Sequence, residues 1–244
     1  MKPAIKVRID RLLVERGLAE TRERAQALLL AGAVFLDGRR IDKPGRLVAP
    51  DMPIEVKGRL RYVSRGGLKL EAALDAFRVD PAGKVCIDIG ASTGGFTDCL
   101  LQRGAARVYA VDTGAGQIDW KLRTDPRVSL LENVNARRLA PQQIGEPANL
   151  LVCDVSFISV TLLLPRFPPL LAPGGEFIVL IKPQFEAGKK LVGKGGIVSD
   201  DDVRRQCCEK VQSEVEALGY RTSTIPSPVL GAGGNQEYLL YARH

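Results

Sequence analysis

The sequence predicts a small α+β unit followed by an α/β domain with a mostly parallel sheet. From about residue 63 to residue 244, short apolar runs alternate with helical periodicity, which is typical of doubly wound sheets. Residues 1–70 contain 16 Lys and Arg against 8 Asp and Glu, a net charge of +8, whereas residues 71–244 contain 19 against 20, a net charge of −1. We therefore place a basic domain at 1–62, a linker at about 57–67 and a second domain at 63–244, and we expect the basic domain to bind a polyanion.

The composition argues against a membrane protein and against a metal-binding protein. The first ten residues lack the apolar core of a secretory signal, and the most apolar stretch, 25–36, is too short to span a bilayer. The five cysteines lack CxxC spacing, and one histidine, His244, cannot complete a Cys/His site. We expect a cytoplasmic protein with reduced thiols, no metal and no membrane partner. The oligomeric state is not readable from the sequence.

The N-terminal elements begin with two short helices. Apolar residues recur at helical spacing over residues 9–17 and again over 21–32, where Thr21 is placed to cap the second helix. Val34–Leu36 predicts a strand, and Asp37-Gly38 predicts a tight hairpin turn. These elements carry nine basic residues: Arg8, Arg11, Arg16, Arg22, Arg24, Arg39, Arg40, Lys43 and Arg46.

Short motifs of this unit resemble the S4 RNA-binding domain. They are Arg8-Ile9-Asp10, Thr21-Arg22, Ala25 and the run GAVFLDG at 32–38, in which Asp37 replaces the usual Asn. The resemblance implies that the unit binds structured RNA through phosphates and shape rather than through base sequence. The alternative is a small helical domain with exposed arginines. We assign RNA contacts to Arg8, Arg11, Arg22 and Arg24 and, beyond this unit, to Arg65 and Lys189.

Five strands are expected to form the parallel part of the sheet: Val85–Ile89, Arg107–Asp112, Val128–Val134, Leu150–Val155 and Glu176–Lys182. Helices are expected over Leu68–Phe77, before Gly104, over Thr161–Leu171, and from a Ser199 cap to Gly219. Two more strands, Tyr220–Ile225 and Glu237–Ala242, are separated only by the loop 226–236. Because that loop is too short for a crossover helix, the last strand should be antiparallel.

A glycine-rich loop, Gly90–Phe96, follows the first of these strands. A dinucleotide site requires a glycine where this loop has Ser92, because the backbone there approaches the pyrophosphate. S-adenosylmethionine has no pyrophosphate, so the loop favours this methyl donor over NAD. Asp112 ends the second strand and can accept hydrogen bonds from both ribose hydroxyls. The alternative is a strand-turn-helix corner in which the glycines serve packing only. We assign the cofactor to Asp88, Gly90, Ala91, Ser92, Thr93, Gly94, Gly95, Phe96, Asp112, Asn135 and Asp154.

Charged residues lie at the predicted strand ends. Asp154 and Lys182 end the fourth and fifth strands, and the carboxyl ends of parallel strands meet at one crevice. Glu237 opens the antiparallel strand, which starts where its neighbours finish. Lys69 lies on the helix before the first strand, where spacing alone indicates an ordinary solvated lysine.

Five segments make a resemblance specific over nearly the whole chain: VSRGGLKL at 63–70, DIGASTGGFTD at 88–98, CDVSFIS at 153–159, IKPQFE at 181–186 and GKGGIV at 193–198. The sequence resembles the TlyA (hemolysin A-like) family of ribosomal RNA 2′-O-methyltransferases. Its second half resembles the FtsJ-type methyltransferases, whose Lys-Asp-Lys-Glu tetrad falls on Lys69, Asp154, Lys182 and Glu237. Tyr62 stands where some members of the family have Trp.

The resemblance implies a Rossmann-like class I methyltransferase fold, with a seven-stranded sheet whose last strand is antiparallel. It also implies S-adenosyl-L-methionine as the cofactor and ribosomal RNA, in ribosomal subunits, as the partner, modified at a cytidine ribose. Lys182 would accept the proton of the attacking 2′-hydroxyl, oriented by Asp154. A lysine acts as a base only when neutral, and burial or a like-charged neighbour such as Lys69 favours that form. Glu237 would position Lys69 or the ribose.

Alternatives remain at this stage. The segment Glu186–Val198, which contains Lys189, is either a lid over the target nucleotide or a mobile surface loop. An NAD-dependent oxidoreductase and a non-catalytic ribosome-assembly factor are the competing functions. A pore-forming hemolysin is disfavoured because no stretch has the length to span a membrane.

Overall fold

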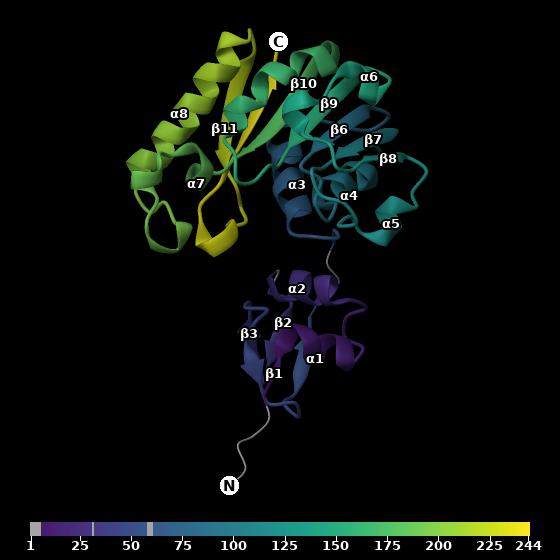
Figure 1. The fold of residues 1–244 in the computed structure, drawn as a ribbon, viewed down its shortest axis with the longest axis vertical. Coiled ribbons are helices and arrows are strands. Elements are labelled where there is room, and N and C mark those ends of the chain that lie inside the picture. Colours follow the sequence, from purple (N-terminus) through teal and green to yellow (C-terminus); the bar gives the residue numbers. More distant parts are fainter. Residues whose placement is uncertain (1–5, 31, 58–60) are drawn as a thin grey trace. The chain divides into compact units, whose positions relative to one another are not determined.

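The computed structural model describes residues 6–30, 32–57 and 61–244, and the chain divides into two compact units, Met1–Arg65 and Gly66–His244 (Figure 1). The linker expected at about 57–67 includes the junction, and its positions 58–60 lie outside the described residues. The same holds for residues 1–5 of the N-terminal stretch and for Ala31 at the end of the expected second helix.

The first unit combines two helices with short antiparallel strands. Its elements are β1 (Val7–Arg8), α1 (Ile9–Glu15), α2 (Arg22–Leu30), β2 (Val34–Leu36), β3 (Arg39–Ile41), β4 (Leu47–Val48) and β5 (Ile54–Val56). The Thr21 hydroxyl accepts a hydrogen bond from the Arg24 amide at 3.1 Å, so it caps α2. Asp37 and Gly38 both have positive φ, 50° and 71°, as a tight hairpin turn between β2 and β3 requires.

The second unit is built on a seven-stranded sheet in the order β11-β12-β10-β9-β6-β7-β8, and labels for all of these except β12 run across Figure 1. The strands are β6 (Val85–Ile89), β7 (Arg107–Val111), β8 (Val128–Leu131), β9 (Ala148–Cys153), β10 (Leu171–Ile181), β11 (Arg221–Pro226) and β12 (Tyr238–Arg243). β12 pairs antiparallel with both β10 and β11, and the pairings among β6 to β10 are parallel. The expected class I methyltransferase sheet is confirmed.

Helices cover both faces of this sheet. The α-helices of this unit are α3 (Gly66–Phe77), α4 (Gly95–Gln102), α5 (Trp120–Arg123), α6 (Pro141–Ile144), α7 (Pro183–Glu186) and α8 (Asp201–Ala217). Phe77 of α3 stacks on Tyr241 of β12 with ring centroids 5.2 Å apart. The neighbours of Tyr241 in that strand, Leu240 and Ala242, belong instead to the core that includes Val211 of α8. Since successive strand residues face opposite ways, α3 and α8 lie on opposite faces.

Two expected helix features differ in the structure. The segment expected as a helix over Thr161–Leu171 forms three single turns of 3₁₀-helix: Val160–Leu162, Leu164–Arg166 and Pro168–Leu170. Its prolines lack amide donors, so a continuous α-helix cannot form. The cap of α8 is Asp200 rather than Ser199, because the Asp200 carboxylate accepts hydrogen bonds from the amides of Asp202 and Val203.

Strand ends also move. β8 stops at Leu131 rather than at Val134, and Asn133 has a φ of 59°, which is incompatible with an extended strand. β10 begins at Leu171 instead of Glu176, with an irregular register between those residues. In the described part of the chain, no helix has both the length and the apolarity to cross a membrane.

Candidate active site

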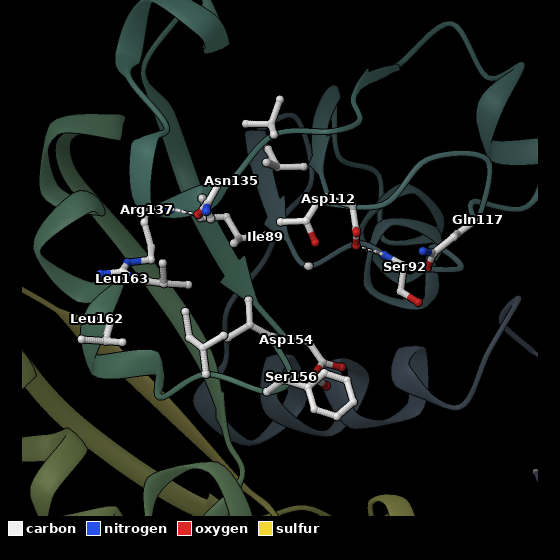
Figure 2. A pocket seen from close by; sticks show the side chains of 18 residues that line it. Ile89, Ser92, Asp112, Gln117, Asn135, Arg137, Asp154, Ser156, Leu162 and Leu163 are labelled. Carbon is white, nitrogen blue, oxygen red and sulfur yellow. Dashed lines mark hydrogen bonds between the residues drawn. The ribbon is translucent and has the colours of Figure 1, made fainter.

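A pocket of about 700 Å³ lies at the carboxyl ends of β6, β7 and β9 (Figure 2). Its volume falls in the range of sites that bind a small molecule or cofactor. The lining includes apolar residues from several elements, among them Ile89, Val111, Val134, Leu162 and Leu163. Carboxylates and amides from the strand ends and the following loops add polar groups. Five of the residues assigned to the cofactor line this pocket: Gly90, Ser92, Asp112, Asn135 and Asp154.

Only glycine fits at position 90, because the backbone there lies close to the backbone of Asp154 and leaves no room for a side chain. Its φ is +84°, and a Cβ built there would collide with the carbonyl oxygen of Asp154 and lie 2.9 Å from its carbonyl carbon. Both the conformation and the contact exclude a larger residue. The missing side chain therefore lets β6 and β9 end side by side at the pocket.

Asp112 is held by backbone amides at the end of β7. Its carboxylate oxygens accept hydrogen bonds from the Ser92 amide at 2.8 Å and the Gly114 amide at 2.7 Å; Figure 2 marks the first of these. Ser92 has a φ of 50°, so the glycine-rich loop turns its amide toward this carboxylate. The arrangement fixes a negatively charged acceptor at the pocket wall.

Asp88 lies on β6, just before the loop, and does not line the pocket. It is fully buried, and one carboxylate oxygen accepts a 2.6 Å hydrogen bond from the Thr97 hydroxyl, while the other has no hydrogen-bond partner among the described residues. Burial raises the pKa of Asp88 to about 7. The carboxyl group thus ties β6 to the first turn of α4 inside the domain.

The other residues assigned to the cofactor form the loop and the start of α4 without lining the pocket: Ala91, Thr93, Gly94, Gly95 and Phe96. Gly94 has a φ of 93° and leaves room for Leu122 and Ile118, which pack on the loop. The Thr93 carbonyl accepts a hydrogen bond from the Asp119 amide at 3.2 Å. These residues therefore hold the loop in place.

Lys182 contacts Asp154, which lines the pocket. They follow β10 and β9, and Lys182 Nζ lies 2.5 Å from an Asp154 carboxylate oxygen. Lys182 Nζ also donates a 2.8 Å hydrogen bond to the Ser156 hydroxyl. The lysine side chain is 10% exposed, whereas Ser156 is exposed and lines the pocket. A nearly buried amine is thus held between two oxygen atoms beside the pocket.

Lys69 and Glu237 form a second pair, between α3 and the residue before β12. Lys69 Nζ donates to a Glu237 carboxylate oxygen at 2.5 Å, and both residues are buried. A Cβ on Gly231 would overlap the Glu237 carboxylate, so a glycine at that position makes room for it. The like-charged neighbour expected for Lys182 therefore has a carboxylate partner of its own.

Several pocket residues had no assigned role in the sequence interpretation: Thr113, Gln117, Ala136, Arg137, Val155, Ser156, Phe157 and Ile158. Ser156 and Phe157 belong to the CDVSFIS segment, whose resemblance to the family could have pointed to them as site residues. Phe157 is 90% exposed and has a φ of 67°, both unusual for a phenylalanine. Asn135 caps a short 3₁₀-helix, accepting a hydrogen bond from the Arg137 amide at 3.0 Å (Figure 2).

The arginines assigned to RNA make contacts inside the first unit. Arg8 and Arg22 both donate to the buried carboxylate of Asp10, at 2.8–3.1 Å, yet their side chains remain 45% and 55% exposed. Arg11 pairs with Glu15 at 2.9 Å, and Arg24 donates to the Val63 carbonyl at 3.3 Å. Arg8 and Arg22 thus stabilise the fold while keeping part of each guanidinium exposed.

The remaining RNA assignments lie elsewhere. Arg65 is half-buried at the end of the first unit, and Lys189 is exposed in the segment after α7. That segment contains two short 3₁₀-helices, Lys189–Leu191 and Lys194–Gly196. Its far end is fixed by the buried Asn235, whose amide group accepts from the Val198 amide at 3.0 Å and donates to the Gly196 carbonyl at 2.9 Å. The loop is anchored at that end.

The chain matches two family models: the FtsJ-like methyltransferase over residues 62–244 and the S4 domain over residues 7–54. It is 51% identical to YqxC of Bacillus subtilis, described as a candidate rRNA methyltransferase, over 97% of this chain and 85% of the relative. It is 44% identical to the 16S/23S rRNA (cytidine-2′-O)-methyltransferase TlyA of Mycobacterium tuberculosis, over 98% and 91%. A solved structure from Streptococcus thermophilus, described as a candidate hemolysin, has a TM-score of 0.77 and 43% identity over 98% of this chain and 89% of that one.

Proposed function

Because the chain belongs to the FtsJ-like methyltransferase family and has an S4 domain before the catalytic unit, we propose that it methylates ribosomal RNA at a ribose 2′-hydroxyl, using S-adenosylmethionine. The relative from Mycobacterium tuberculosis is named for this reaction at cytidine, which is the target we propose here. The observation that carries the proposal is the contact of the buried Lys182 with Asp154, a carboxylate that lines the cofactor-sized pocket.

The pocket residues fit S-adenosylmethionine. Asp112 presents a fixed carboxylate to a ribose diol, and apolar residues such as Val111 and Leu163 suit an adenine ring. The absent side chain of Gly90 leaves the loop open to the pocket, and Asp154 supplies a negative charge that suits a cationic sulfonium. When bound, the cofactor supplies an electrophilic methyl group.

In this mechanism Lys182 accepts the proton of the target 2′-hydroxyl as the oxygen attacks. Its Nζ lies 2.5 Å from an Asp154 carboxylate oxygen and donates a 2.8 Å hydrogen bond to the Ser156 hydroxyl, so two contacts fix the position of the amine. Lys69, held by Glu237, binds the ribose or its phosphate. Aligning the reacting groups supplies up to roughly 7–11 kcal/mol in well-oriented systems. We therefore assign most of the rate acceleration to the positioning of the reacting groups.

The S4 unit supplies affinity for the RNA. Its exposed basic residues, including Arg39 and Lys43, offer phosphate contacts, and the half-exposed Arg8 and Arg22 add to them. Ribosomal subunits are the partner we propose, and the cytoplasm is the compartment in which the protein meets them. A target base stacked inside a helix must be turned out at a cost of a few kcal/mol.

The competing functions explain less of the structure. A non-catalytic assembly factor accounts for the basic unit but gives no role to the buried Lys182 and Lys69 pairs. An NAD enzyme would need close backbone approach to a pyrophosphate where this loop has Ser92.

Single-turnover methyl transfer to ribosomal RNA tests the proposal. The Lys182→Ala variant should lose at least about 10²-fold in rate, because removing the base and its alignment acts on the chemical step. Lys84→Ala, which removes a lysine–carboxylate pair just before β6 and outside the site, is the matched control and should stay near wild type. Affinity for RNA and for S-adenosylmethionine is measured separately by filter binding and calorimetry. A Lys182→Ala rate within a few-fold of wild type contradicts the assignment.

A further inference from the structure

A buried carboxylate, Glu186, joins the two chain segments that carry Asp154 and Lys182. We infer that Glu186 is a positioning residue, which fixes the segment 154–160 so that both partners of Lys182 stay at its Nζ. Glu186 does not line the pocket, so it acts through other residues. The inference rests on the proposed function, because it assigns Glu186 to the alignment of the proposed base.

The contacts of Glu186 point directly at that segment. One carboxylate oxygen accepts a 2.7 Å hydrogen bond from the Val160 amide, and the other accepts a 2.5 Å hydrogen bond from the Ser159 hydroxyl. The Glu186 side chain is 2% exposed and ends α7, which starts directly after Lys182. The carboxylate thus ties the end of the segment 154–160 to the helix that follows the base.

The middle of the segment contains the partners of Lys182 and a strained residue. Asp154 and Ser156 contact Lys182 Nζ, and Phe157 follows with its φ of 67°. Such a conformation persists in a bulky residue only where its surroundings hold it. The Phe157 ring lies against Phe185, the neighbour of Glu186, with centroids 5.3 Å apart. Helix α7 therefore contacts the segment both at its middle and at its end.

A role confined to stability explains this placement less well. Burying a carboxylate away from water costs folding free energy. Well-packed apolar residues often replace buried ion pairs without loss of stability. The cation paired with the Glu186 carboxylate, Lys210, has its Nζ 3.6 Å away and a side chain that is 47% exposed, so it offsets that cost only in part. The directed hydrogen bonds, rather than charge pairing, are what an apolar residue could not supply.

The test measures single-turnover methyl transfer to ribosomal RNA together with hydrogen exchange of the peptide that contains Val160. Glu186→Ala should slow transfer on the order of 10²-fold and raise exchange at Val160, with affinities for RNA and S-adenosylmethionine within a few-fold of wild type. Glu186→Gln keeps an acceptor for the Val160 amide, so it should restore the rate to within about tenfold of wild type.

A matched control separates positioning from stability. Glu176 lies in the middle of β10, the strand that precedes Lys182; it pairs with Lys84 at 2.6 Å and accepts a hydrogen bond from Tyr241. Glu176→Gln should lower the thermal midpoint but leave the transfer rate unchanged. If Glu186→Ala does not fold, Ser159→Ala removes one of the two hydrogen bonds from the other side and should slow transfer several-fold.

The outcomes are distinct. If the wild-type protein transfers no methyl group to ribosomal RNA, the proposed function is wrong, and the exchange measurement alone still tests the tie between Glu186 and Val160. If the wild type is active and Glu186→Ala transfers methyl groups within about threefold of its rate, the positioning role is overturned. Unchanged exchange at Val160, or equal slowing in Glu176→Gln, overturns it as well.

Discussion

Substituting Gly90 with alanine probes the contact between the glycine-rich loop and the backbone of Asp154. Two effects combine at this position: a φ of +84° and a collision of the new Cβ with the Asp154 carbonyl group. Gly83 offers a matched control, because its φ is +69° and a Cβ there would have no atom within 4 Å. Comparing the two variants separates the conformational cost from the collision.

The expected magnitudes follow from these two terms. The left-handed conformation costs a non-glycine residue about 1–2 kcal/mol, so Gly83→Ala should lower the free energy of unfolding by that amount. Overpacking against backbone costs about 1–3 kcal/mol more, which Gly90→Ala alone should show. The collision also displaces Asp154, which contacts Lys182 at 2.5 Å. A misplacement of about 1 Å can slow a reaction on the order of 10²-fold.

Thermal unfolding measures the loss of stability in each variant, and single-turnover methyl transfer measures the loss of rate. For a chain of this size, each kcal/mol corresponds to roughly 2–4 °C in the thermal midpoint. Gly83→Ala should therefore lose a few degrees and keep its transfer rate, whereas Gly90→Ala should lose more of both, together with affinity for S-adenosylmethionine. Equal stability losses in the two variants, or a Gly90→Ala rate within threefold of wild type, would show the reasoning to be wrong.

Other predictions concern buried and exposed charges. Because the pKa of Asp88 is raised to about 7, the folded state holds the extra proton, and stability should fall as the pH rises from about 4 to about 7. Thermal midpoints measured across that range should show the fall, and Asp88→Asn should reduce it; an unchanged slope would count against the buried carboxyl. The hydrogen bond from Arg8 holds the pKa of Asp10 well below its usual value, so stability of the first unit should be retained above about pH 4 and decline below it. Asp10→Asn weakens charge-assisted hydrogen bonds and should cost about 1.5–3 kcal/mol in urea unfolding of that unit, and a loss under about 0.5 kcal/mol would contradict this. Arg39→Ala and Lys43→Ala should each weaken RNA binding at all sequences and lower the slope of log affinity against log salt by about 1; slopes equal to wild type would argue against phosphate contacts.

The sequence was sufficient for the sheet and placed most strand boundaries to within two residues. Strand residues Val85–Ile89 were predicted without error, because a buried parallel strand followed by a glycine turn leaves a clear pattern. The antiparallel last strand followed from the shortness of the loop at 226–236. The stretch 161–171 was wrong as an α-helix, since periodicity was weighed above the three prolines that interrupt it.

The site was only partly readable. Strand-end positions predict that Asp154 and Lys182 approach each other, because parallel strands share an edge. The contact of Lys69 with Glu237 spans 168 positions and depends on how α3 packs beside β12, which no local pattern encodes. The hydrogen bond from the Val160 amide to Glu186 likewise depends on tertiary packing. Ser156 lay within a recognised segment, but its contact with Lys182 needs the turn after β9.

Analysis of the modified nucleoside tests the central claim most directly. Ribosomal RNA incubated with S-adenosylmethionine labelled in its methyl group is digested to nucleosides and resolved by chromatography with mass spectrometry. The wild-type protein should place the label on the ribose of cytidine, as 2′-O-methylcytidine, and Lys182→Ala should leave the RNA unlabelled. Label on a base, or equal ribose labelling by Lys182→Ala, would contradict the account.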